Sequence, residues 1–290
     1  MRLLKSVFAA ALLTASGLAY SGSQNCADKS PPTPQEAAQR TAQAKVLNDW
    51  LEKQGDRVVL LVRQGQTLSD YGLSFSHAGY AVRERNGTWR VYHNLNTCGT
   101  AQSELWIQGL YQFIDDDLAG NTIATLHFPP ALQSQLLKVL RDPELRKALH
   151  NPAYNMVAHP FATDSQNSNG WVLMVFAAAR SPGVNSVSAG VNWLKSEFYI
   201  GSSAEAGLIK RALADSLMPH MSTDGQCRLY GAAAGIITTP VILYPAAIIS
   251  DGSIFRRFFV LLPVYVISRP AFTDNLSVTL NFLFLLFSLI

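Results

Sequence analysis

The stretch that most constrains the fold of this chain is a predicted β-hairpin between Ser76 and Asn96. Two runs rich in tyrosine, valine and tryptophan flank Asn86-Gly87, a dipeptide that favours a tight turn between two antiparallel strands. His77 lies at the start of the first run and His93 near the end of the second. The hairpin therefore predicts a small sheet that carries two histidines near one of its ends.

The orientation of the two histidines depends on the length of the hairpin loop. A two-residue loop places His77 on one face with Asn94 and Asn96, and His93 on the other face. A three-residue loop with Gly87 in the left-handed conformation places His77 and His93 on the same face. The first register gathers the arginines of the hairpin on one side and is the one favoured. His93, Asn94 and Asn96 are all candidates to orient His77.

Composition excludes several classes of function. Of the 290 residues, 48% are hydrophobic and 15% are charged, and the formal net charge is +3. No cluster of basic residues alternates with aromatic ones, so no nucleic-acid binding is expected. The spacings typical of zinc ligands and of phosphate-binding loops are absent from the sequence, so no metal and no cofactor are expected. His127 and His150 are predicted to be structural.

The N-terminus predicts export from the cytoplasm. Residues 1–21 begin with positive charge, continue with a short apolar run from Val7 to Leu13 and end with small residues, which is the pattern of a secretory signal peptide. The apolar run is short for a membrane span. The expected location of the mature protein is the periplasm or the outside of a bacterial cell.

Export changes what the three cysteines are expected to do. Cys26, Cys98 and Cys227 lie in an oxidising compartment after export. Because three is an odd number, at most one pair forms within the chain. The predicted disulfide joins Cys26 to Cys98 and ties the mature N-terminus to the end of the hairpin. The alternative is that none of the three pair.

Hydrophobic periodicity and breaker residues predict the remaining elements of an α+β domain over residues 22–230. The apolar run at 57–63 is expected to be a buried strand. The fold class is thus a small antiparallel sheet with flanking helices. Helices are predicted over 34–54, 100–118, 131–140, 142–150, 171–180, 188–195 and 203–217, with Asn167, Ser168 and Asn169 at the N-terminus of the fifth.

The last sixty residues differ in composition from the rest of the chain. Residues 231–290 contain no lysine and no glutamate, and they include three apolar runs that are each short for a membrane span. Either this tail associates with a membrane, or the native reading frame is lost near residue 230. The abrupt change in composition favours the second interpretation. Membrane association is expected only through this tail.

Two resemblances to known families follow from these motifs. A histidine on the first strand of a hairpin, a polar residue on the second strand and Asn167-Ser168 at a later helix start resemble the permuted papain-like amidases and acyltransferases, which include the NlpC-type proteins. Residues 57–224 more specifically resemble an uncharacterised exported bacterial family, domain of unknown function 2145. The segments that carry this second resemblance are RQGQ, SHAGYAVRE, HNLNTCGT, GLYQFIDDDL, YNMVAHPF and QNSNGWVL.

The papain-like resemblance implies a permuted papain-like fold and a set of catalytic roles. Ser168 corresponds to the nucleophile, His77 to the base, and His93 or Asn94 to the orienting group. The family pattern has cysteine where this chain has Ser168, and an alkoxide forms less readily than a thiolate. The expected function is hydrolysis or acyl transfer on an amide or ester, with a small acyl or amide substrate or a cell-envelope component as partner. The alternative is a non-catalytic binding or structural protein that keeps the fold.

Overall fold

The computed structural model describes residues 31–65, 75–115, 122–199, 201–205, 221–223, 236–239, 259–268 and 277–286. Within these ranges the chain forms an antiparallel β-sheet with helices on both faces. The helices are α1 (Pro34–Gln54), α2 (Leu110–Asp115), α3 (Pro130–Arg141), α4 (Pro143–Ala148), α5 (Ser168–Arg180) and α6 (Val187–Ser196). This arrangement confirms the predicted α+β class.

The main sheet has the strand order β4-β3-β2-β1-β5-β8-β9, and every neighbouring pair is antiparallel. A second, two-stranded sheet pairs β6 with β7. The strands are β1 (Val58–Arg63), β2 (His77–Arg83), β3 (Trp89–Asn96), β4 (Ser103–Gly109), β5 (Thr122–His127), β6 (Ser202–Glu205), β7 (Ile236–Thr239), β8 (Phe259–Ser268) and β9 (Ser277–Leu286). Among the described strands, β4 is thus at one edge of the main sheet.

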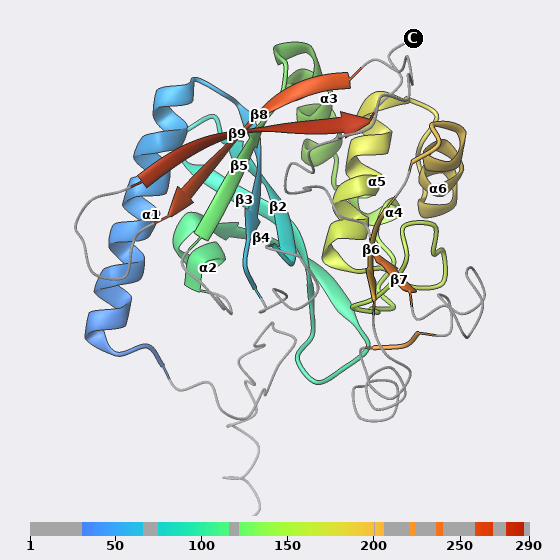
Figure 1. The fold of residues 1–290 in the computed structure, drawn as a ribbon, viewed down its shortest axis with the longest axis horizontal. Helices are drawn as coiled ribbons and strands as arrows, with labels where there is room; N and C mark the ends of the chain where they lie inside the picture. The colour runs from blue at the N-terminus through green and yellow to red at the C-terminus, as the bar shows by residue number, and fades with distance from the viewer. Residues whose placement is uncertain are drawn as a thin grey trace, which may run out of the picture.

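The main sheet lies between α1 and α2 on one side and α3 and α5 on the other (Figure 1), and a hydrophobic core lies on each face. Val59 and Leu61 of β1 pack in one core with α1 and α2, whereas Leu60 and Val62 pack in the other with α3 and α5. Successive side chains of a strand point to opposite faces, so a strand between two helical layers is apolar at every position. Strand β1 is buried along its whole length, as its unbroken apolar run predicts.

Local signals define helix α1. The hydroxyl oxygen of Thr33 accepts a hydrogen bond from the Glu36 N–H, while the Glu36 carboxylate accepts one from the Thr33 N–H. This capping box and Pro34 in the first turn favour a helix start here. Gly55 follows the helix with a φ of +72°, which glycine adopts without steric cost. The predicted limits of 34–54 are confirmed.

The predicted hairpin is present, but the favoured two-residue register is wrong. Tyr80 pairs with Tyr92 and Arg83 with Trp89. The Glu84 N–H then donates to the Thr88 carbonyl over 2.8 Å, which leaves a three-residue loop that ends at Gly87. Gly87 has a φ of +84°, as a three-residue loop with a bulge requires. Backbone geometry at this glycine therefore outweighs the arrangement of surface arginines.

Strand β4 replaces the first half of the helix predicted at 100–118. Among the described residues of this range, Leu110–Asp115 is helical, while Ser103–Gly109 pairs with β3 along its whole length. Residues such as Trp106 and Ile107 favour strands when a neighbouring strand is available, and β3 supplies one. Strand β5 was not predicted. The helix predicted from residue 203 is also wrong at its start, because Ser202–Glu205 is strand β6.

Several predictions for the two ends of the chain concern residues outside the described ranges. The signal peptide at 1–21 lies outside them, and so do Cys26 and Cys227. In the tail, β8 pairs with β5 and β9 pairs with β8. These pairings test neither the membrane-association interpretation of the tail nor the frame-loss interpretation. Across the described ranges, no helix combines the length and the apolar character needed to cross a membrane.

Candidate functional site

The three-residue hairpin loop brings the two predicted histidines into contact. His77 Nε2 lies 2.9 Å from His93 Nδ1, and the ring centroids are 5.2 Å apart. His93 is fully buried, while His77 at the start of β2 is partly exposed. The absence of a side chain at Gly79 leaves room for the His93 ring beside His77. A Cβ atom at Gly79 would lie only 3.0 Å from the Cβ of His93, which is closer than most Cβ contacts.

A chain of hydrogen bonds determines which ring nitrogens carry protons. His93 Nε2 lies 3.1 Å from Gln108 Oε1, and a carbonyl oxygen can only accept. His93 therefore donates through Nε2, and in the neutral ring its Nδ1 is the acceptor for His77 Nε2–H. His77 Nδ1 is then the ring nitrogen without a proton. Phe113 of α2 packs against both rings, with centroids 5.9 Å from His77 and 5.6 Å from His93.

Both histidines of this pair are uncharged at neutral pH. Burial lowers the pKa of His93 to about 3, and the neighbouring Arg63 guanidinium acts in the same direction. Burial, Arg63 and His93 together hold the pKa of His77 well below its usual range. Arg63 is itself buried at the end of β1 and lies 5.1 Å from the centroid of the Phe113 ring. A neutral imidazole is a competent base, but a base requires a nucleophile beside it.

The predicted nucleophile belongs to the opposite helical layer. Ser168 is the first residue of α5, which covers the sheet face that carries Tyr80, whose hydroxyl donates to the Val172 carbonyl of α5 over 3.0 Å. His77 and His93 face α2 on the other side of the sheet. No hydrogen bond joins Ser168 to either histidine among the side chains that the structure describes.

Asn94 is also separated from His77. It alternates with His93 along β3 and therefore faces the α5 side, where it is fully buried. The structure thus brings together His77 and His93 but not Ser168 or Asn94. Asn167 caps α5 through the Gly170 N–H and donates to the Met156 and Ala158 carbonyls. This local role agrees with the ordinary preference for asparagine at helix starts.

A second candidate site, which the sequence did not predict, is a groove between strand β4 and helix α4. We call it the β4–α4 groove, and its volume is about 340 Å³. Its lining combines aromatic, apolar, cationic and hydroxyl side chains with one carboxylate, that of Glu104. The lining residues are Tyr92, Ser103, Glu104, Leu105, Trp106, Ile107, Pro143, Arg146, Lys147, His150 and Trp171.

The groove holds a positively charged wall in a fixed position. The guanidinium of Arg146 lies 5.2 Å from the centroid of the Tyr92 ring and donates to the Leu140 carbonyl. The neighbouring Lys147 is exposed on the same helix. An arginine held by an aromatic ring and a carbonyl loses little side-chain freedom when it binds an anion.

A hydroxyl–imidazole pair lies in the same groove. Ser103 Oγ is 3.0 Å from His150 Nε2, and burial lowers the pKa of His150 to about 4. His150 was predicted to be structural, yet it also lines the groove. The pair escaped sequence analysis because 47 positions separate its members and because β4 was assigned to a helix.

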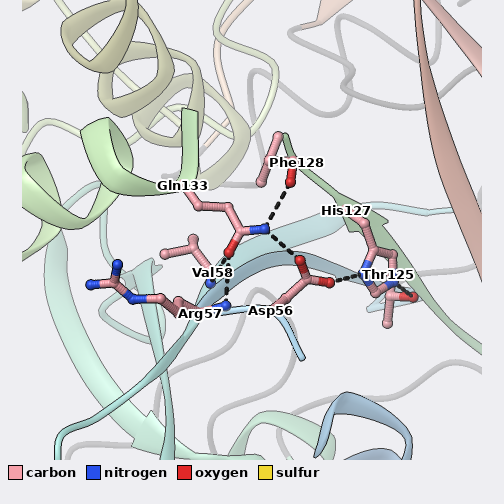
Figure 2. A network of polar contacts seen from close by, with 7 residues as sticks. All are labelled: Asp56, Arg57, Val58, Thr125, His127, Phe128 and Gln133. Atoms are coloured by element: carbon pink, nitrogen blue, oxygen red, sulfur yellow. Dashed lines mark hydrogen bonds and ion pairs between the residues drawn. The ribbon is translucent and has the colours of Figure 1, made fainter. Parts of the chain in front are cut away.

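A third polar cluster joins the α1–β1 connection, β1, β5 and α3 (Figure 2). Asp56 Oδ2 lies 2.5 Å from His127 Nδ1, and His127 Nε2 lies 2.9 Å from Thr125 Oγ1. This order of carboxylate, imidazole and hydroxyl resembles a catalytic triad. Thr125, however, is fully buried within β5 between β1 and β8, so no substrate reaches its hydroxyl. The cluster is structural, as predicted for His127.

The described side chains include one member of the predicted disulfide and no candidate metal site. Cys98 lies in the turn between β3 and β4, but its predicted partner Cys26 lies outside the described residues, so the pairing stays a prediction. Within the described ranges, no group of three or more histidine, cysteine, aspartate or glutamate residues is placed to hold a metal ion.

Comparison with protein families identifies one match. A family model described as "Uncharacterized protein conserved in bacteria (DUF2145)" matches residues 50–242. This range contains the histidine pair, the β4–α4 groove and the whole of α5. Comparisons with curated proteins and with solved structures find no match.

Proposed function

The chain belongs to the bacterial family of domain of unknown function 2145, and we propose that it is a binding protein whose ligand site is the β4–α4 groove. The ligand is an anionic molecule with an apolar or aromatic part. The observation that carries this proposal is the combination of Arg146 and Lys147 with the side chains of Tyr92 and Leu105 around one groove. Small-molecule sites commonly have volumes of roughly 300–1,000 Å³ with few, well-placed polar groups.

The alternative, hydrolysis or acyl transfer by a papain-like site, needs Ser168 beside His77. The position of Ser168 on the helix layer across the sheet weakens that alternative. The histidine pair instead forms a closed contact with Phe113 and Gln108. Its hydrogen bonds join β2, β3 and β4 beneath α2. This arrangement supports a structural role for the pair in place of the predicted catalytic one.

The chemistry of the groove favours a carboxylate ligand. A guanidinium and an ammonium group on one wall can both donate charge-assisted hydrogen bonds to carboxylate oxygens. Tyr92 and Leu105, on the sheet face that α5 covers, provide aromatic and apolar surface for the uncharged part of the ligand. Export through the signal at 1–21 is part of the proposal, and it makes a cell-envelope component the natural source of such a ligand.

The first prediction concerns binding of a simple carboxylate. We expect N-acetylglutamate to bind and to change the tryptophan fluorescence of the protein, while the uncharged N-acetylglutamine α-amide binds at least ~10-fold more weakly. The double substitution Arg146→Gln and Lys147→Gln removes this difference. Lys195→Gln, at an exposed position of α6, is the matched control and retains it. Equal affinity of wild type for the two probes would overturn the proposal.

The second prediction separates binding from catalysis. A fluorophosphonate probe reacts with activated serine hydroxyls, and we expect no labelling of the folded protein. The test compares wild type with Ser168→Ala and Ser103→Ala by intact mass. Stoichiometric labelling of wild type that disappears in either variant would show a nucleophilic serine and would replace the binding proposal with a hydrolase.

A further inference from the structure

Strand β4 presents unpaired backbone positions along the edge of the main sheet. The Thr97 N–H donates to the Gln102 carbonyl over 2.7 Å, so Gln102 directs its backbone groups toward β3. The Ser103 N–H donates away from β3, to the Pro152 carbonyl over 2.8 Å. Because these directions alternate along an antiparallel strand, the N–H and C=O groups of Leu105 and Ile107 point outward from the sheet.

The chain itself begins to pair with this edge and then stops. Gln102 and Ala153 form an isolated antiparallel bridge, and the next outward N–H, that of Ser103, bonds to Pro152. From Leu105 onward, no described segment continues the ladder beyond β4. An unpaired strand edge is a template for another extended chain. The exposed fraction of Ile107 is 48%, so this part of the edge is accessible.

The β4–α4 groove runs along the same edge. Five consecutive residues of β4, from Ser103 to Ile107, form one wall, and four residues of α4 and its flanks form the other. An extended chain advances about 3.3 Å per residue, so a segment of four to five residues matches the length of this wall. The groove and the unpaired edge therefore describe one elongated site rather than two.

We infer that the occupant of this site is an extended peptide segment with an acidic side chain, which adds to β4 as a further strand. The inference rests on the proposed function and specifies its ligand. Backbone groups of Leu105 and Ile107 pair with the peptide, and its acidic side chain meets Arg146 and Lys147. Strand addition supplies affinity through the main chain, while a side-chain contact supplies specificity. The cationic wall selects an acidic side chain over a basic one.

The experiment uses the full-length mature protein and the synthetic peptide acetyl-TVEVT-amide, with N-acetylglutamate as the small probe. Two further peptides carry N-methyl groups on alternate residues, one on the odd and one on the even positions. Only one set of amides can face β4. We expect one methylated peptide to bind ~10-fold or more weakly than the parent, and the other to bind within about threefold of it.

Substitutions at Ile107 test the same point from the protein side. The Ile107 N–H points away from β3, so Ile107→Pro removes an edge donor and leaves the ladder to β3 in place. We expect this variant to bind the peptide ~10-fold or more weakly than Ile107→Ala does, while the two variants bind N-acetylglutamate equally. Ile107→Ala removes the side chain alone, so it is the reference variant that accounts for loss of the Ile107 side chain in both measurements.

The outcomes separate the two proposals. If N-acetylglutamate binds but both methylated peptides bind as well as the parent, strand addition is wrong and the anionic groove stands. If neither N-acetylglutamate nor any peptide binds, the proposed function itself fails. Self-association of the protein that Ile107→Pro abolishes, detected by sedimentation without added peptide, would show a second copy at the edge and would also overturn the peptide inference.

Discussion

Replacement of Gln133 by leucine is expected to lower the free energy of unfolding by about 3–5 kcal/mol. The Gln133 side chain is buried at the start of α3 and connects four groups (Figure 2). Its Oε1 accepts from the Arg57 and Val58 N–H groups over 2.7 and 3.2 Å. Its Nε2 donates to the Phe128 carbonyl over 2.7 Å and to the Asp56 carboxylate. Leucine leaves these groups buried without this partner.

Gln135→Leu provides the matched control, because Gln135 is exposed on the same helix. We expect its effect on the free energy of unfolding to be within about 0.5 kcal/mol. Urea unfolding followed by circular dichroism measures both variants. Equal stability of the two variants would contradict the structural role assigned to the cluster of Asp56, His127 and Gln133.

Acidification from pH 7 to pH 5 is expected to destabilise the fold by about 2 kcal/mol through His93 alone. The pKa of His93 in the folded protein is about 3, against about 6.5 for an unperturbed histidine. Between these two values the unfolded chain binds a proton that the folded protein does not. Stability therefore falls as the pH decreases through this window, and it is fully regained above about pH 6.5.

Two other histidines act in the same direction. The pKa of His150 is lowered to about 4, and that of His77 is also lowered. His93→Gln is expected to reduce the slope of the free energy of unfolding against pH by the equivalent of about one proton. His150→Gln is the second variant, to be used if His93→Gln does not fold. Urea unfolding at intervals between pH 7 and pH 5 gives the slopes. A wild-type stability that is constant across this range would contradict the burial of neutral histidines.

The local elements of this protein could largely be predicted from its sequence. Thr33, Pro34 and Gly55 carry the capping and termination signals of α1, so its limits follow from nearest neighbours along the chain. The apolar run of β1 and the Asn86-Gly87 turn are equally local. Asp142 and Pro143 correctly predicted the start of α4, where the Asp142 side chain accepts from the Leu145 N–H.

Other features depend on partners that lie far away in the sequence. Residues 103–109 form a strand only because β3 is available to pair with them. The Ser103–His150 pair and the groove around it exist because α4 packs near the edge of the sheet. Periodicity within a segment carries no information on these long-range contacts, so the groove could not be found from the sequence.

The sequence by itself determined the α+β class, most helix limits, the hairpin with its two histidines and the membership of the bacterial family. Only the tertiary structure decided which of the candidate side chains meet. The three-residue loop at Gly87 turned His93 toward His77, and the packing of α5 on the other face set Ser168 apart from both. The physical reason is that strand faces alternate with each residue, so a loop longer by one residue changes which side chains share a face.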